Sequence, residues 1–459
     1  MPIRPTNVKL NASSVDILNA IRNSASSNYR DYIPSAENNP ESVREIGAIL
    51  MDFPVLQNEF VSALINRIGA VLLESKTYQN PWSVFKRGRL EFGESIEVIF
   101  TNIAKAHSYD VVESESKVFQ REIPDIRAAF AFVNYQQFYK QTIQEEDLKQ
   151  AFLSWDGVSS LIASIVDAMY TANETDEFLT MKYMLAKTML AGRIKAVEIS
   201  ANDIRGTIAT VKSVSNKMTF QNTKYNPAGV MANTKKDEQY IIVNSDFDAT
   251  MDVEVLAAAF NMSKAEFMGH RVLVDSFGDF DDERLNELFQ NDPAYVPLTD
   301  DEKAALSVIP AVLVDKNWFL IYDKLFKFTE QYNGQGLYWN YWLHVWKIFG
   351  ISPFAQGALF VPGEPSVTSV TITPAEVTMY PGMMTTLSVE VETANFASKE
   401  VNWSSDALGV TVNRDGVVTV SPDIPFDGRD LTITITATSA FDSTKSATAT
   451  ITVPAPAGT

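Results

Sequence analysis

Residues 336–350 read GLYWNYWLHVWKIFG and hold three of the seven Trp of the chain. As a strand, this stretch places five large apolar side chains on one face, because successive side chains point to opposite faces: Leu337, Trp339, Tyr341, Leu343 and Val345. The other face carries Tyr338, Asn340, Trp342, His344 and Trp346. Aromatic residues favour strands, and a strand of this length spans on the order of 40 Å. We predict a long strand suited to a structural spine; a helix is the alternative.

Two stretches upstream of this strand have helical periodicity. In residues 55–73, Phe60, Leu64, Ile68 and Leu72 lie four apart, which indicates an amphipathic helix. Residues 145–194 keep apolar spacings of three and four and give the strongest helical signal of the chain. We expect Gly157 and Asn173 to divide this second run.

The stretch 197–362 alternates segments of strand and helix character. Residues 239–243 and 271–275 read as strands, and residues 253–260 and 264–268 as helical segments. Residues 310–314 and 318–323 read as a strand pair joined by a turn at Asp315-Lys316-Asn317. Together these segments indicate an α+β body.

The sequence changes character at Gly363. The 97 residues from there to Thr459 hold 18 Thr, and three period-two runs oppose Thr, Ser or Glu to apolar residues. The apolar positions are Leu387, Val389 and Val391; Leu431, Ile433, Ile435 and Ala437; and Ala449, Ile451 and Val453. Such alternation is typical of strands with one solvated face, and Asp415-Gly416 is a hairpin signal. Residues 363–459 are therefore predicted to form a separate all-β sandwich.

Composition limits the classes of function. The 459 residues are 46% hydrophobic, enough for a sizeable core, and carry a net charge of −19. The sandwich accounts for −7 (4 basic, 11 acidic) and the body for −12 (34 basic, 46 acidic). Acidic surfaces repel phosphates, so tight or sequence-specific DNA binding is disfavoured, although DNA could still be enclosed. Zero Cys is compatible with a reducing cytoplasm, and no apolar leader or membrane-spanning run is expected.

Residues 80–120 read as a hairpin-like excursion with complementary charge. Turn residues punctuate it, and basic side chains precede acidic ones: Lys86, Arg87 and Arg89, then Glu91, Glu94 and Glu97. The alternative is a solvated surface loop.

The residues that could support chemistry form no recognisable motif. His107, His270 and His344 are far apart in sequence and match no metal-binding spacing. Asp279, Asp281, Asp282 and Glu283 lack the spacing of a calcium loop and are expected to be mutually repelling, solvated loop charges. Asp246 and Asp248 lie two apart on one side of a segment expected to be extended. We therefore predict no catalytic residue, metal or cofactor; a carboxylate-dependent hydrolase is the alternative.

Several segments, in order, resemble the major capsid proteins of small short-tailed phages, and most closely those of protein-primed Bacillus phages. They are 19–24 (NAIRNS), 138–139 with 141–144, 259–262 (AFNM), 312–325 (VLVDKNWFLIYDKL) and 336–346. The resemblance implies a Hong Kong 97-type capsid fold. Its parts would be an N-terminal arm with helices (1–79), an E-loop (80–122), a P domain with a spine helix (123–195), an A domain (196–335) and return strands of the P domain (336–362). Residues 280–309 look like an insertion.

The C-terminal part resembles the group 2 bacterial immunoglobulin-like domain. The likeness lies in residues 401–405 (VNWSS), 410–413 (VTVN) and 415–420 (DGVVTV). It implies that Trp403 is a buried core residue of residues 363–459.

The resemblance implies a shell protein of a virion, made in the host cytoplasm. It would form pentamers and hexamers with other copies, assemble with a scaffolding protein and a portal, and enclose double-stranded DNA without sequence-specific binding. We expect Lys86, Arg87, Arg89, Glu94 and Glu97 to contact neighbouring subunits. The sandwich would face outward, where it could contact the host surface or a glycan. A cell-surface adhesin or glycan-binding protein is the alternative.

Overall fold

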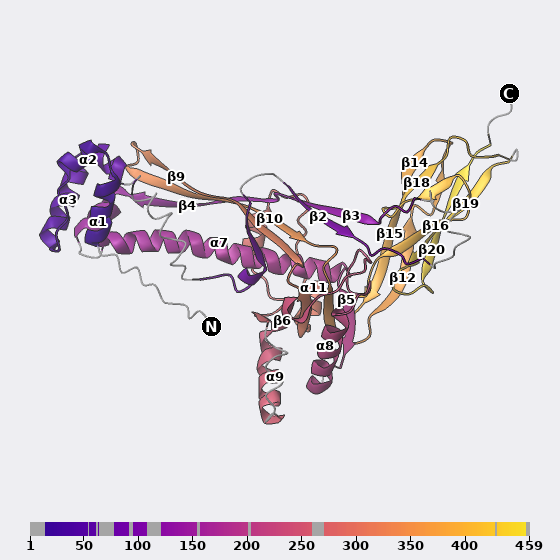
Figure 1. The fold of residues 1–459 in the computed structure, drawn as a ribbon. Helices are drawn as coiled ribbons and strands as arrows, with labels where there is room; N and C mark the ends of the chain where they lie inside the picture. Colours follow the sequence, from indigo (N-terminus) through magenta and orange to yellow (C-terminus); the bar gives the residue numbers. More distant parts are fainter. Residues whose placement is uncertain are drawn as a thin grey trace.

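The computed structural model describes residues 14–53, 55–60, 63, 78–90, 95–107, 121–153, 157–200, 203–258, 270–426 and 429–455. The molecule is elongated: helices α1–α3 lie at one end, the C-terminal sandwich lies at the other, and α7 runs between them (Figure 1). Helices α8 and α9 project to one side of this long axis.

A four-stranded sheet lies along α7 (Gly157–Leu190), in the order β1-β9-β10-β4. Its strands are β1 (Lys86–Arg89), β9 (Phe319–Asn333), β10 (Tyr338–Ile351) and β4 (Tyr135–Gln144). β10 pairs antiparallel with both β9 and β4, which confirms the long strand predicted from residues 336–350.

The predicted inward face of β10 is confirmed except at its first position. Trp339, Tyr341, Leu343 and Val345 are each at most 4% exposed and belong to the main core with Tyr170, Met181 and Leu185 of α7. Leu337 is 55% exposed and has a φ of +52°. It lies in the turn from β9 to β10, where the chain reverses before the strand begins.

A five-stranded sheet has the order β5-β11-β8-β6-β7. Its strands are β5 (Lys195–Ile199), β11 (Gly357–Pro362), β8 (Ala311–Asp315), β6 (Gln239–Asn244) and β7 (Arg271–Val274). Every residue of β6 and β8 is buried. Helix α8 (Ile204–Met218) packs on this sheet through Val211, Val214 and Met218.

The predicted pairing of residues 310–314 with 318–323 is wrong. Both segments are strands, but β8 pairs with β6 and β11, whereas β9 pairs with β1 and β10. The buried Asp315 carboxylate fixes the turn between them: it accepts hydrogen bonds from the Asn317 backbone N–H and the Thr234 hydroxyl, both at 2.6 Å. The chain therefore passes from one sheet to the other, and the predicted ranges 196–335 and 336–362 each include strands of both sheets.

Helix α9 (Ser245–Ala258) follows β6 directly. Asp246 and Asp248 lie in its first turn, so the prediction of an extended segment is wrong there. Carboxylates are favourable near a helix N-terminus, and Asp248 also forms an ion pair of 2.7 Å with Arg271. Of the predicted helix 253–260, residues up to Ala258 are helical; residues 264–268 lie outside the described ranges.

The helical run 145–194 forms α6 (Glu145–Leu153) and α7. The predicted division near Gly157 is confirmed, but Asn173 does not divide α7. Asn173 is 3% exposed, and burial of α7 between neighbouring elements outweighs the modest helix propensity of Asn. Of the predicted helix 55–73, residues 55–60 and 63 are helical, and the others lie outside the described ranges.

The N-terminal end is a small helical cluster of α1 (Ser14–Ser24), α2 (Ser27–Tyr32) and α3 (Pro40–Asp52). The Asn39 side chain caps α3 by accepting a hydrogen bond from the Ser42 backbone N–H. Gly47 allows α3 to approach α6 closely, because a Cβ there would lie 2.6 Å from the Cβ of Phe152.

The acidic stretch 280–309 forms α10 (Asp282–Phe289) and α11 (Asp300–Ser307). The prediction of mutually repelling loop charges is wrong. Asp281 caps α10, Asp282 forms an ion pair with Lys303, and Glu302 completes a capping box with Thr299. Acidic residues cluster here because two short helices begin within the stretch.

The C-terminal part forms the predicted sandwich. Its strands are β12 (Ser366–Thr373), β13 (Glu376–Thr378), β14 (Met384–Thr386), β15 (Ser388–Ala394), β16 (Val401–Ser405), β17 (Val410–Val412), β18 (Val417–Val420), β19 (Leu431–Ser439) and β20 (Ser446–Val453). Most of the predicted inward residues, including Ile435, Ala437 and Ile451, are buried in one cluster. β17 and β18 form the hairpin predicted at Asp415-Gly416.

Trp403 differs from the prediction of a buried core residue. It lies on β16 and packs against the core while remaining partly exposed. The smaller Val418, Ile435 and Ile451 fill the centre. The Trp403 ring covers the turn at Gly416, where a Cβ would lie 3.2 Å from the indole and 2.3 Å from the Leu387 carbonyl oxygen.

A buried charged cluster joins α7 to the four-stranded sheet. The Glu177 side chain is fully buried and forms ion pairs with Lys347 of β10 and, at 2.9 Å, with Lys86 of β1. Asp323 of β9 lies 3.3 Å from the Lys86 ammonium. Asn80 donates a hydrogen bond of 2.8 Å to Glu177. The cluster therefore connects three strands and the segment before β1 to one helix.

The charges in this cluster stabilise each other. Burial alone would raise the pKa of Glu177, but Lys347 and Lys86 outweigh it and lower the pKa to about 2. Burial would likewise lower the pKa of Lys86, but Glu177 and Asp323 outweigh it and raise that pKa above its ordinary value. Glu177 and Lys86 are both charged at neutral pH.

We predict that Glu177→Gln destabilises the folded subunit by about 3–5 kcal/mol, because it removes the nearest carboxylate of the buried Lys347 ammonium, which then keeps only Asp323 at 3.9 Å. Urea unfolding of unassembled subunits at pH 7 measures this change. Glu45→Gln, an exposed position on α3, is the matched control and should change the free energy of unfolding by less than about 0.5 kcal/mol. Equal losses in the two variants would contradict the prediction.

We also predict that the loss of unfolding free energy caused by Glu177→Gln depends on pH. The lowered pKa of Glu177 means that its carboxylate contributes fully above its ordinary value of 4.5, and that the contribution is lost as the pH falls toward about 2. A protonated Glu177 resembles Gln. The gap in unfolding free energy between wild type and Glu177→Gln should therefore narrow between pH 5 and 2, and a constant gap over that range would refute the assignment.

Candidate functional site

The three histidines lie in separate places. His107 forms an exposed pair of 2.6 Å with Glu122, the His270 ring centroid lies 4.9 Å from that of Tyr240, and His344 Nε2 lies 3.0 Å from the Thr329 hydroxyl. In the described part of the chain, no three His, Asp or Glu side chains are grouped so that they could hold a metal ion.

The most distinctive surface is a two-stranded antiparallel hairpin of β2 (Ser95–Thr101) and β3 (Ile126–Phe132). Alternate residues of both strands are exposed. Four large apolar side chains lie on this face, each 57% to 62% exposed: Ile99, Ile126, Phe130 and Phe132. We call these four residues the exposed hairpin face. A contiguous apolar surface of this kind is typical of a protein–protein interface.

The opposite face of the hairpin anchors it to the body. Phe100 stacks on Phe354 with ring centroids 5.6 Å apart. The Asn102 side chain accepts a hydrogen bond of 3.1 Å from the Met231 backbone N–H, and Arg127 donates to the Ala228 carbonyl. Because the hairpin is attached on this side, its apolar residues on the other side remain available to a partner.

Polar contacts also fasten the described ends of the hairpin. Asn102 donates a hydrogen bond of 2.5 Å to the Asp125 carboxylate, and Arg127 lies 3.3 Å from it. The bonds from Asn102 and Arg127 lower the pKa of Asp125. A charged Asp125 thus joins the residue after β2 to the residues that begin β3.

The predicted contact residues are not grouped in one place. Lys86 lies in the buried charged cluster, engaged within its own chain. Arg87 is half-buried and donates to the Phe319 carbonyl at 3.3 Å, whereas Arg89 is exposed at the end of β1. Glu97 is exposed on β2, opposite Phe130. Glu94 lies outside the described residues.

The charge pattern of residues 80–97 predicts a polar contact and does not indicate the exposed hairpin face. The paired strands comprise residues 95–101 and 126–132, so the second strand lies beyond the predicted range 80–120. The available signal was the composition of β2 and β3, SIEVIFT and IRAAFAF, which places apolar residues on both faces. A strand that is apolar on both faces needs a partner on each.

No described helix combines the length and apolar character needed to cross a membrane. The exposed apolar residues identified above lie on strands, where a protein surface can cover them.

Comparison with known proteins identifies two parts of the chain. Residues 18–361 match the family model of the Phi29-like phage major capsid protein. Residues 366–451 match the bacterial Ig-like domain (group 2). The first match ends and the second begins close to Gly363, where the sequence changes character.

Two relatives of this chain are major capsid proteins of Bacillus phages. The major capsid protein of Bacillus phage B103 is 38% identical over 419 residues, which cover 89% of this chain and 87% of the relative. The major capsid protein of Bacillus phage PZA is 33% identical over 418 residues, with the same coverage of both chains. A solved structure, the capsid of Staphylococcus phage Andhra, is similar in fold, with a TM-score of 0.50, 14% identity and coverage of 62% of this chain and 85% of that one.

These matches favour a capsid protein over an adhesin. Since the family model covers most of the chain and both relatives exceed 30% identity, the chain belongs to the Phi29-like phage major capsid protein family, and is a shell protein of a phage virion with a C-terminal bacterial Ig-like domain.

Proposed function

We propose that the chain builds its shell as a subunit of the Hong Kong 97 type. In this proposal β2 and β3 form the E-loop, α7 with β4, β9 and β10 forms the P domain, and the five-stranded sheet with α8 and α9 forms the A domain. The helices α1–α3 belong to the N-terminal region. The assignment is supported by the long helix lying along a long sheet, and by a hairpin that presents apolar residues to the outside.

The single observation that supports assembly best is the exposed hairpin face. We infer that Ile99, Ile126, Phe130 and Phe132 lie against a neighbouring subunit, with Glu97, which lies opposite Phe130, in the same contact. Arg87 and Arg89 of β1 are proposed to contact neighbouring subunits separately. Burial of one large apolar side chain contributes about 1.5–3 kcal/mol. Modest contacts of this size, repeated around each ring of five or six copies, close a shell while leaving single errors reversible.

The remaining partners follow from the role of a container. A scaffolding protein would guide assembly, and a portal would occupy one opening. The net charge of −19 suits a wall that encloses double-stranded DNA without sequence-specific binding, because like charges repel. The family is one of structural proteins, and we assign the chain no enzymatic role.

The Ig-like domain is proposed to face outward, where it contacts the host surface. Its compact core is separate from the main core of the body, as suits an accessory module. A virion displays many copies, so weak individual contacts would add up to firm attachment.

We predict that Phe130→Ser combined with Phe132→Ser lowers shell yield at least tenfold, because both aromatic contacts with the neighbour are lost. Sedimentation and electron microscopy measure the yield, and circular dichroism checks that subunits remain folded. Leu408→Ser, at a 93% exposed position of the Ig-like domain, is the matched control. Normal shells from the double variant would overturn the assembly role of the hairpin.

We also predict that chains lacking residues 363–459 still form closed shells, because the hairpin, α7 and both body sheets precede Gly363. Electron microscopy of the truncated protein gives the answer. Failure to assemble while the subunits remain folded would show that the Ig-like domain is part of the building unit.

A further inference from the structure

The Ig-like domain is fastened to the body at the end of α7. Gly192 has a φ of +65°, and a Cβ there would lie 2.4 Å from the Ala397 carbonyl oxygen and 2.9 Å from the Ser398 Cα. Phe396 packs against the main core of the body. Such close backbone approach requires Gly, so the domain rests on the body in a defined position.

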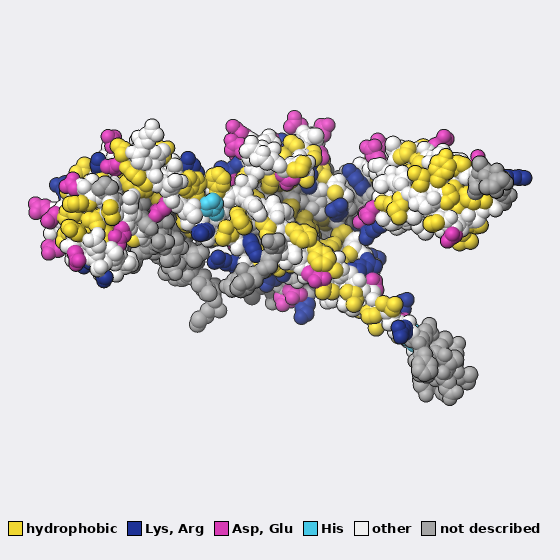
Figure 2. Space-filling model, turned by 90° about the horizontal axis from the view of Figure 1, so that it is seen from above, with side chains coloured by type: hydrophobic (Ala, Val, Ile, Leu, Met, Phe, Trp, Pro, Cys, Tyr) yellow, Lys and Arg dark blue, Asp and Glu magenta, His cyan; other side chains and the backbone are white. Residues whose placement is uncertain are grey.

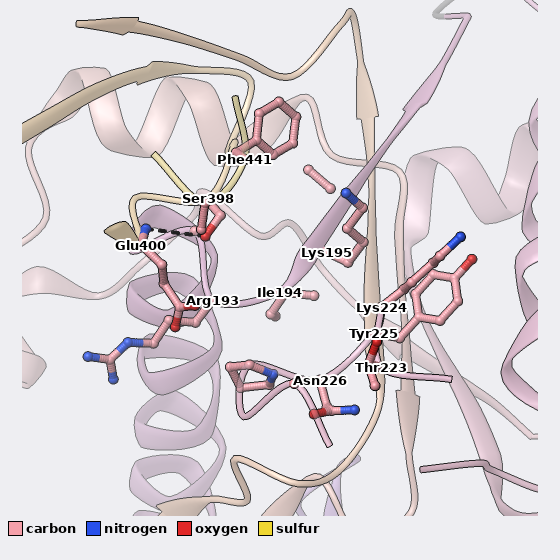
Figure 3. Close-up of a pocket in the computed structure, with 15 residues that line it drawn as sticks. Arg193, Ile194, Lys195, Thr223, Lys224, Tyr225, Asn226, Ser398, Glu400 and Phe441 are labelled. Carbon is pink, nitrogen blue, oxygen red and sulfur yellow. Dashed lines mark hydrogen bonds between the residues drawn. The ribbon is translucent and has the colours of Figure 1, made fainter. Parts of the chain in front are cut away.

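A cleft of about 290 Å³ lies at this junction. The body lines it with residues 192–196 and with the loop residues 223–227 and 229, and the Ig-like domain lines it with Ser398, Glu400, Ala440 and Phe441. In Figure 3, Phe441, Ser398 and Glu400 of the Ig-like domain lie in the upper part of the view, and Lys195 reaches up toward the Phe441 ring. The Lys195 ammonium lies 5.1 Å from the centroid of that ring. The cleft exists only because both domains contribute walls.

Three cationic side chains surround the cleft. Arg193, Lys195 and Lys224 are all exposed, and none of them has a carboxylate within ion-pair distance among the residues described here. The one carboxylate in the lining, Glu400, has its own partner in Arg414 at 3.5 Å. Figure 2 shows Lys and Arg side chains on the body beside the junction. A concentration of unpaired positive charge in a chain of net charge −19 favours an anionic ligand.

The lining also offers neutral hydrogen-bonding groups. Thr223, Tyr225 and Ser398 supply hydroxyls. The Tyr225 phenol is protonated at neutral pH, and burial raises its pKa further. The Asn226 side chain is occupied in holding the loop, through bonds of 2.8 and 2.9 Å with the backbone of Val230. This bond pair fixes the loop that carries Lys224 and Tyr225.

We propose that the cleft binds a segment of an anionic glycan, that is, a sugar or polyol unit bearing a phosphate or a carboxylate. Cationic side chains would pair with the acidic group, and the hydroxyls would bond those of the carbohydrate. The volume suits a segment of one or two units. Its use in host attachment rests on the proposed outward position of the Ig-like domain, whereas the binding itself does not.

The test uses assembled particles of the full chain and four soluble polymers: poly(glycerol phosphate), polygalacturonate, neutral dextran and, as an anionic polymer without carbohydrate, poly-glutamate. Wild-type particles should bind one or both of the anionic polymers and not dextran, with affinity falling as salt rises. The comparison of the two anionic polymers distinguishes phosphate from carboxylate recognition. Lys195→Gln combined with Lys224→Gln should lower affinity at least tenfold.

The matched control is Lys212→Gln combined with Lys217→Gln, two exposed lysines of α8, which removes the same charge and should leave affinity within about twofold. Arg193→Gln serves as a second cleft variant that leaves the Lys195–Phe441 contact in place. The proposal would be overturned if neither anionic polymer bound, or if dextran bound equally well. It would also be overturned if the cleft and control variants lost equal affinity. Poly-glutamate binding as tightly as the glycans would overturn the carbohydrate assignment.

Adsorption of particles to cells separates the cleft from the proposed function. If cleft variants lose glycan binding but adsorb normally, the site is confirmed and its role in host attachment fails. If no glycan binds but particles with the Ig-like domain adsorb better than particles without it, the outward domain is supported and the cleft proposal is refuted.

Discussion

The ion pairs of Glu177 are the interaction on which the body of this subunit depends. One buried carboxylate on α7 holds Lys347 of β10 and Lys86 of β1, and Asp323 of β9 completes the group. An isolated buried charge is costly, so these elements must come together for any of the charges to be stable. The cluster thereby aligns the long helix with the long sheet.

Two surfaces of the subunit differ in what they present to a partner. The hairpin of β2 and β3 is attached on one face through Phe100, Asn102 and Arg127 and is apolar on the other. At the C-terminal end of α7, Gly192 allows the Ig-like domain to rest directly on the body.

Much of the architecture could be predicted from local patterns. The inward face of β10, the alternating strands of the sandwich and the long helical run all follow from periodicity, because burial imposes a repeat of two or of 3.6 residues. The partners of the predicted contact residues could not be predicted in this way. Lys86, grouped with Arg87 and Arg89 by its place in the sequence, is bound inside its own chain, since its partner Glu177 lies far away in sequence and no local pattern links them.

The sequence by itself determined that the chain has an α+β body and a separate β sandwich, that β10 is a long strand with one buried face, and that the chain resembles phage capsid proteins. Only the tertiary structure decided that β8 and β9 lie in different sheets, that Trp403 sits at the margin of its core, and that residues 192–196 line one cleft with Ser398 and Glu400. The reason is physical: periodicity reports which face of an element is buried, whereas the partner that buries it is chosen by contacts between distant segments.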